Sequence, residues 1–79
     1  MTPQEIQSLL ESKLAGCEIK VGGDGYHHEI TVIGDAFEGL NAVKRQQYVY
    51  AALKEKIADG TIHAVIIKTY TPAQWAEKP

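Results

Sequence analysis

The sequence predicts an α+β domain of two layers, in which helices cover one face of a three-stranded mixed sheet. Two segments carry helix start and stop signals around apolar residues spaced three and four apart. Three others alternate between apolar and polar residues or are rich in β-branched ones. The order is helix, strand, strand, helix, strand. The first two strands should form a hairpin, and the crossover helix places the third strand parallel to the second.

The first helix is predicted near the start of the chain. Thr2 and Glu5 have the spacing of a capping box, and Pro3 occupies the first helical position, where proline is favoured. Gly16 is a typical residue to end such a helix. Apolar residues at helical spacing should form its buried side: Ile6, Leu9, Leu10 and Leu14.

Residues 17–33 predict a β-hairpin. Cys17, Ile19 and Val21 alternate with charged residues, which is the two-residue period of a half-exposed strand. Three glycines within residues 22–25 favour a turn, because glycine adopts positive φ at little cost. The second strand spans residues 26–33, and its alternation places the neighbouring His27 and His28 on opposite faces.

The long helix and its flanks come next. Residues 34–40 form a short loop with room for one helical turn. Asn41 is a good N-cap and Gly60 is the usual residue beyond a helix C-terminus, so residues 41–60 predict the helix. The residues at helical spacing that we expect on its buried side are Val43, Gln46 or Gln47, Tyr50, Leu53 and Ile57.

Residues 61–70 predict the third strand. Their β-branched residues are nearly continuous, which is typical of a strand covered on both faces or nearly so. Beyond it, Thr71, Pro72 and Gln74 repeat the cap and proline of the N-terminus and predict a short terminal helical turn. We expect the indole of Trp75 to fold back onto the domain.

The composition indicates a single globular domain, residues 1–79. The hydrophobic fraction of 44% argues against disorder. The single cysteine cannot form an internal disulfide, so we expect a reducing compartment, the cytoplasm. No apolar run is long enough to cross a bilayer, the N-terminus does not resemble a signal peptide, and we expect no membrane association. A net charge of −2 does not favour binding to phosphate backbones.

Few residues can carry chemistry. His63, at the mouth of the third strand, is either a metal ligand or a histidine hydrogen-bonded to the backbone. His27 is either a solvent-facing strand residue or a ligand. Cys17 is expected to be a small core residue, since no histidine lies near it in sequence to activate it. Paired catalytic acids, a Ser-His-Asp order, Cys-x-x-Cys and a phosphate-binding loop are all missing, so an enzyme is the least supported class.

The chain resembles the BolA family, and within it the bacterial IbaG branch. The segments that carry the resemblance are Gly23-Asp-Gly25, Phe37-Glu-Gly-Leu40, Val43-Lys-Arg-Gln-Gln-Tyr-Val-Tyr50, Ile62-His-Ala-Val65 and Tyr70-Thr-Pro-Ala-Gln-Trp-Ala76. The resemblance implies a fold similar to a class II KH domain. It also implies partnership with a monothiol glutaredoxin, in which the two proteins and glutathione share a 2Fe–2S cluster. The family histidine of the Ile-His-Ala motif corresponds to His63.

The resemblance implies a second ligand in the turn between the first two strands. Asp24 stands where some members have a cysteine, and His27 lies just beyond it. Carboxylate is a poor ligand for cluster iron compared with thiolate or imidazole. Either His27 takes the role, or Asp24 is a weak ligand, or His63 binds alone; a zinc ion held by His63 and an acid is a further alternative. The isolated chain is expected to carry no cofactor.

Two further surfaces and two alternative functions follow from the residues. Lys44, Arg45 and Tyr48 are candidates for a KH-like regulator that binds DNA weakly, although the loop of residues 34–39 lacks the Gly-x-x-Gly spacing of KH domains. Phe37 and Leu40 either contact a protein partner or close the core. The last alternative is a plain interaction domain in which His63 serves only the core. The sequence leaves open whether two copies associate.

Overall fold

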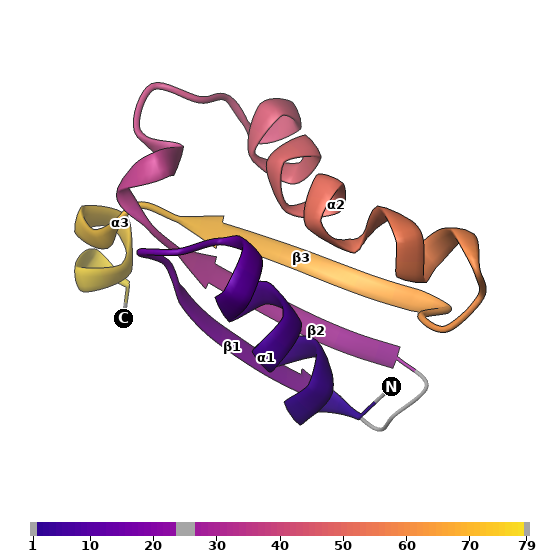
Figure 1. Ribbon diagram of the computed structural model, residues 1–79. Coiled ribbons are helices and arrows are strands. Elements are labelled where there is room, and N and C mark those ends of the chain that lie inside the picture. Colours follow the sequence, from indigo (N-terminus) through magenta and orange to yellow (C-terminus); the bar gives the residue numbers. More distant parts are fainter. Residues whose placement is uncertain (1, 24–26, 79) are drawn as a thin grey trace.

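The computed structural model of the chain describes residues 2–23 and 27–78. It shows the predicted order of helix, strand, strand, helix, strand, with a short helix at the end (Figure 1). A single 3-10 turn, η1, occupies part of the loop before the long helix. The elements are α1 (Pro3–Lys13), β1 (Glu18–Gly23), β2 (His27–Ile33), η1 (Asp35–Phe37), α2 (Ala42–Ala58), β3 (Ala64–Tyr70) and α3 (Pro72–Glu77).

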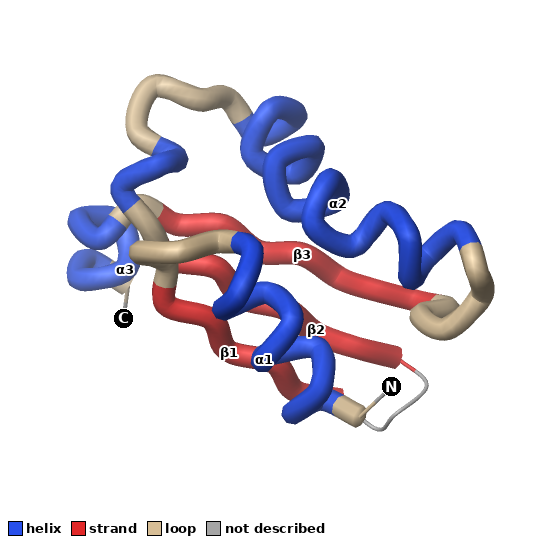
Figure 2. The backbone as a smooth tube through the Cα atoms, in the orientation of Figure 1, coloured by secondary structure: helices blue, strands red, loops and turns tan. Residues whose placement is uncertain are grey.

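The three strands form one mixed sheet in the order β1-β2-β3 (Figure 2). β1 pairs with β2 antiparallel, and β3 pairs with β2 parallel. α1 packs mainly against β1 and α2 against β3, so the two long helices form a layer over one face of the sheet. The prediction of a two-layer α+β domain with a mixed sheet is confirmed. Among the described residues, no helix has the length and apolar character needed to cross a membrane.

The helices begin where their capping residues predict. The backbone N–H of Glu5 donates to Thr2 Oγ1 over 3.2 Å, and the Thr2 N–H donates to Glu5 Oε1 over 2.9 Å. These hydrogen bonds lower the pKa of the exposed Glu5 carboxyl. Thr71 and Gln74 form the same reciprocal pair at the start of α3. Asn41 caps α2 by accepting from the Lys44 N–H over 2.9 Å.

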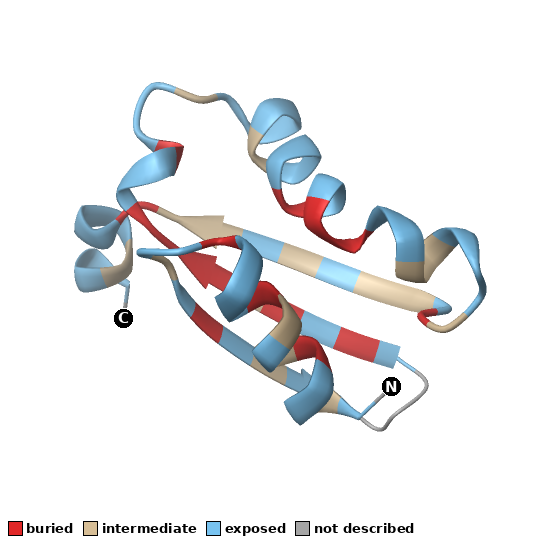
Figure 3. Ribbon diagram, viewed as in Figure 1, coloured by how far each residue is buried: buried red, intermediate tan, exposed pale blue. Residues whose placement is uncertain are grey.

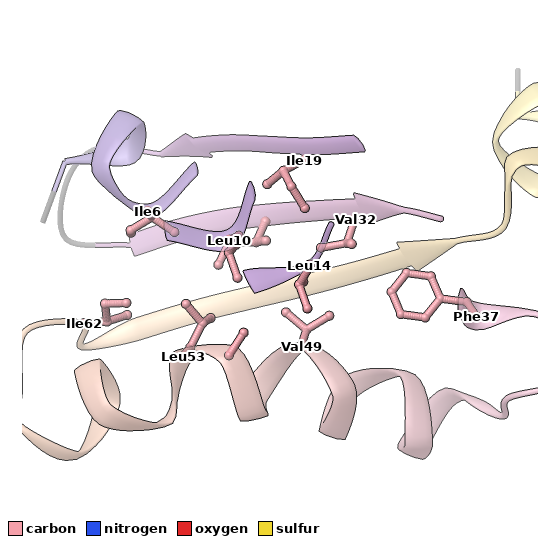
Figure 4. Packing of buried hydrophobic residues seen from close by; sticks show 11 residues of the cluster. Ile6, Leu10, Leu14, Ile19, Val32, Phe37, Val49, Leu53 and Ile62 are labelled. Atoms are coloured by element: carbon pink, nitrogen blue, oxygen red, sulfur yellow. The ribbon is translucent and has the colours of Figure 1, made fainter. Parts of the chain in front are cut away.

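The core lies between the sheet and the helix layer (Figures 3 and 4). It takes buried residues from α1, β1, β2, η1 and α2, while β3 contributes half-buried residues that pack against it, and Phe37 from η1 closes it at one end. The fully or nearly buried hydrophobic residues of this cluster are Ile6, Leu10, Leu14, Ile19, Ile30, Val32, Phe37, Val49, Ala52, Leu53 and Ile62.

The side of α2 that was predicted to be buried is wrong. The side that faces the core is rotated about the helix axis relative to the predicted one. Val49, Ala52 and Leu53 face the core, whereas Val43 is 65% exposed and Tyr50 is 41% exposed. The helix carries two apolar stripes at helical spacing that share Leu53. Packing against β3 and α1 selects one of them, and helical spacing alone cannot tell the two apart.

The prediction that β3 is covered on both faces is also wrong. Ile66 is 57% exposed and Lys68 is exposed, because no helix of the described residues packs over the second face of the sheet along most of its length. α3 lies at one end of this strand. There the Trp75 ring packs against Tyr70, with 5.3 Å between ring centroids, which confirms that the indole folds back onto the domain.

Candidate functional site

The pairing of β2 with β3 brings two histidines to the same end of the sheet. His27 opens β2, and its partner across the parallel ladder is Ala64, the first residue of β3. His63 directly precedes Ala64, and both His27 and His63 are exposed. Asp24, the other ligand candidate from the predicted turn, lies outside the described residues. The register therefore brings two predicted ligands that are 36 positions apart in the chain to one end of the sheet, although it pairs His27 with Ala64 and not with His63 itself.

A glycine sets the backbone beside His27. Gly23 has a φ of 127°, in the region that favours glycine, and a Cβ built on it would collide with the carbonyl oxygen of His27. Any other residue at this position would push the backbones of β1 and β2 apart at the point where β2 starts. The sequence predicts a turn over residues 22–25, but Gly22 and Gly23 are the last two residues of β1.

His28 is not part of this pair. It is 2% exposed, on the helix-covered face of β2 with Ile30 and Val32, while its neighbour His27 is on the surface. The opposite orientations predicted for the two histidines are confirmed. Within the described residues, the Nδ1 atom of His28 is buried without a hydrogen-bond partner, so this imidazole is a packing group.

The two exposed histidines carry imidazole nitrogens, the type of donor that metal centres use. Neutral imidazole binds iron and zinc, and paired histidines replace two cysteines on one iron of Rieske-type 2Fe–2S centres. No group of three or more histidine, cysteine or acidic side chains gathers within residues 2–23 and 27–78 to hold a metal ion. The donors fit a cluster iron, and further ligands would come from another molecule or from the turn.

Cys17 lies far from the histidines. It precedes β1, whose first residue pairs with the last residue of β2, at the opposite end of the sheet from His27. Burial raises the pKa of its thiol, and the nearby Asp35 carboxylate raises it further. The sulfur also lies against the backbone of Gly34, where a Cβ would come within 2.5 Å of Sγ. The thiol therefore belongs to packing and is poorly suited to ligation.

The three residues of the predicted nucleic-acid surface have different roles. Arg45 Nε donates to the carbonyl of Leu40 over 2.9 Å, and its Nη1 donates to Gln74 Oε1 over 2.8 Å. The Tyr48 ring packs edge-on against Phe37, with 5.6 Å between centroids. Only Lys44 among them is an exposed residue for which no side-chain contact is seen in the described structure. DNA binding through these residues stays a prediction that this arrangement does not strengthen.

Through these two hydrogen bonds, the Arg45 side chain links α2 to the preceding loop and to α3. Replacing it with alanine should lower the free energy of unfolding by about 1 kcal/mol, because two hydrogen bonds to a charged donor are lost at a partly exposed site. Urea denaturation measures this change, and Lys44→Ala, one residue away, should move it by less than about 0.5 kcal/mol. Equal free energies of unfolding for Arg45→Ala and Lys44→Ala would show that the Arg45 hydrogen bonds do not stabilise the fold.

Of the two roles left open for Phe37, partner contact or core closure, the structure shows the second. Phe37 is fully buried, with the Arg45 guanidinium 5.9 Å from its ring, and Leu40 is half-buried against the core. An aromatic ring in a short loop can serve a surface or a core. Here η1 turns the ring inward, so Phe37 closes the core and offers no surface to a partner.

The chain is similar to known proteins and solved structures. The model of the family described as BolA-like protein matches residues 1–74. The acid stress protein IbaG of Escherichia coli strain K12 is 51% identical over 76 residues, which cover 96% of this chain and 90% of that protein. A bolA homologue from Coxiella burnetii has a TM-score of 0.86 at 35% identity, covering 98% of this chain and 99% of that one. Yeast Fra2 has a TM-score of 0.78 at 30% identity, with 98% and 86% covered.

Proposed function

The chain belongs to the BolA-like protein family, and from this premise we propose that it is a non-enzymatic partner of a monothiol glutaredoxin that co-ligates a 2Fe–2S cluster. The observation that carries the proposal is the β2–β3 register, which brings exposed His27 and His63 to one end of the sheet. The likeness to a BolA domain of SufE1 from Arabidopsis thaliana, with a TM-score of 0.76 at 30% identity, agrees with a role as a module that works beside another protein.

His63 is the principal ligand in this proposal, and His27 is the second. Both imidazoles are exposed at the surface, so a partner can reach them without opening the core. His63 directly precedes the edge strand β3, whose first residue, Ala64, pairs with His27. A bound 2Fe–2S cluster would supply one-electron redox chemistry and transferable iron. This chain's part is to present imidazole nitrogen donors to the cluster iron.

The surroundings of the pair support a ligand role over a catalytic one. The hollows on α2 are lined by residues of that helix, and another lies between α3 and the end of β3. A further hollow on the sheet is lined by residues that include Gly22 and Glu29, and neither His27 nor His63 lines any of these four. Cys17, the only thiol, lies at the far end of the sheet with a raised pKa. The proposed role is therefore cluster storage, trafficking, or sensing of iron and redox state.

A titration tests the proposal. A monothiol glutaredoxin that carries its cluster and glutathione is mixed with increasing amounts of the chain, and visible circular dichroism follows the cluster. We expect a new spectrum that saturates at one chain per glutaredoxin, together with a mixed complex on size exclusion. An unchanged spectrum and separate elution of the two proteins would contradict the proposal.

A parallel measurement separates this proposal from DNA binding. Fluorescence anisotropy with a short labelled duplex should show weak binding at most, falling steeply as salt rises, because the chain is acidic overall. Tight binding to DNA that the double variant Lys44→Glu, Arg45→Glu abolishes, with no effect of glutaredoxin, would favour the regulator instead.

A further inference from the structure

α2 presents a second apolar side to solvent, which we call the outer α2 surface. Val43 and Tyr50 are exposed, and Ile57 is half-buried, so an apolar residue recurs every seven positions. Two adjoining hollows along this side share Gln47 and Tyr50 and form one shallow groove. The outer α2 surface comprises Val43, Gln46, Gln47, Tyr50, Lys54 and Ile57.

This surface points away from α1. The opposite flank of α2, with Tyr48 and Ala52, lines a hollow with Lys13 and Leu14 at the end of α1. α2 lies on the β3 side of the helix layer, and α1 lies on the β1 side (Figures 1 and 4). The outer α2 surface therefore borders the side of the molecule where β3 forms the free edge of the sheet.

The core is incompletely covered on that same side. On the helix-covered face of β2, Ile30 and Val32 are fully buried. On the corresponding face of β3, Val65 and Ile67 are only half-buried, although both pack against the core. An added helix beside α2 would cover the margin of β3 and the outer α2 surface together.

We propose that a second copy of this chain occupies this side, with the two α2 helices packed antiparallel about a two-fold axis near Tyr50. The seven-residue spacing makes the surface self-complementary, as a two-fold interface requires. Val43 of one copy meets Ile57 of the other, and Tyr50 meets Tyr50. Lys54, the only charge on the surface, meets the uncharged Gln46 of the other copy, so no like charges face each other.

The available area is small for a specific interface. α2 has 17 residues and is about 25 Å long. With the margin of β3 it offers a strip of about 500 Å² per copy, and the total of about 1,000 Å² is at the low end for specific interfaces. The expected product is a reversible dimer with a dissociation constant of tens of micromolar, on the order expected for a weak transient contact.

Sedimentation velocity of the full chain without cluster tests the proposal, from about 10 µM to about 1 mM, a range that brackets the expected constant. The wild type should shift from monomer to dimer, and Tyr50→Glu should raise the dissociation constant at least about tenfold. Ile66→Glu is the matched control, because Ile66 is 57% exposed on the open face of the sheet. A wild type that stays monomeric throughout, or a dimer lost in Ile66→Glu and kept in Tyr50→Glu, would overturn it.

Disulfide trapping tests the antiparallel arrangement. In a Cys17→Ser background, chains with Gln46→Cys and chains with Lys54→Cys are oxidised alone and as a mixture. Because Gln46 and Lys54 face each other across the proposed axis, the mixture should give mainly mixed cross-linked dimers. Cross-linking that is stronger within each variant than between them would rule the arrangement out. Neither test uses the histidines, so the outcome is independent of the cluster proposal.

Discussion

His63→Ala should abolish the mixed cluster with glutaredoxin while leaving the fold intact. His63 is exposed, lies just before β3, and is outside the buried core, so its truncation removes a donor without opening a cavity. In the visible titration, the glutaredoxin spectrum should stay unchanged at ratios where the wild type has converted it fully. Thermal unfolding of His63→Ala should match the wild type within the range typical of surface substitutions, about 0.5 kcal/mol.

Two companion variants make this prediction specific. His63→Cys should restore a mixed cluster with a lower reduction potential, because replacing histidine by thiolate lowers the potential of such centres. His27→Ala should weaken the mixed complex without abolishing it if His27 is the second ligand. A His63→Ala chain that still converts the spectrum would remove His63 from the ligand set.

Phe37→Ala should lower the free energy of unfolding by about 3–4 kcal/mol, the largest stability effect expected in this chain. Phe37 is fully buried, packs edge-on against Tyr48, and lies 5.9 Å from the Arg45 guanidinium. Its removal leaves a cavity at the end of the core, between η1 and α2. Urea denaturation measures the change.

Small domains have only about 5–15 kcal/mol of stability, so Phe37→Ala leaves little reserve. Phe37→Leu retains most of the volume and should cost about 1.5 kcal/mol at most. Tyr48→Ala removes the ring that packs on Phe37 from a residue that is 38% exposed, and it should cost less than Phe37→Ala. Little loss of stability in Phe37→Ala would mean that the ring is not a core residue.

The element order and both reciprocal caps could be predicted from sequence because they depend on local chemistry. Thr2 with Glu5 and Thr71 with Gln74 satisfy backbone groups within four residues, and the structure shows those hydrogen bonds. The side of α2 that faces the core could not be predicted. Val43 and Tyr50, seven positions apart, fit a helical repeat as well as Val49 and Leu53, four apart, and only the positions of β3 and α1 decide between them.

The candidate site was predictable in part. The Ile-His-Ala motif identified His63, and alternation separated His27 from His28. That His27 and His63 lie at one end of the sheet depends on the register of β2 with β3, which involves residues far apart in sequence. The role of Arg45 escaped prediction for the same reason, since its partner Gln74 is 29 positions away. A basic residue on a helix gives no local signal of such a contact.

Pulsed electron paramagnetic resonance of the reduced mixed complex tests the central claim most directly. The chain is labelled at histidine with the heavy nitrogen isotope, and the glutaredoxin is left unlabelled. We expect a strong hyperfine coupling from heavy nitrogen, because an imidazole of this chain binds a cluster iron, and we expect His63→Cys to lose the coupling assigned to that residue. A mixed complex whose cluster shows no coupling to heavy nitrogen would contradict the claim that this chain supplies a histidine ligand.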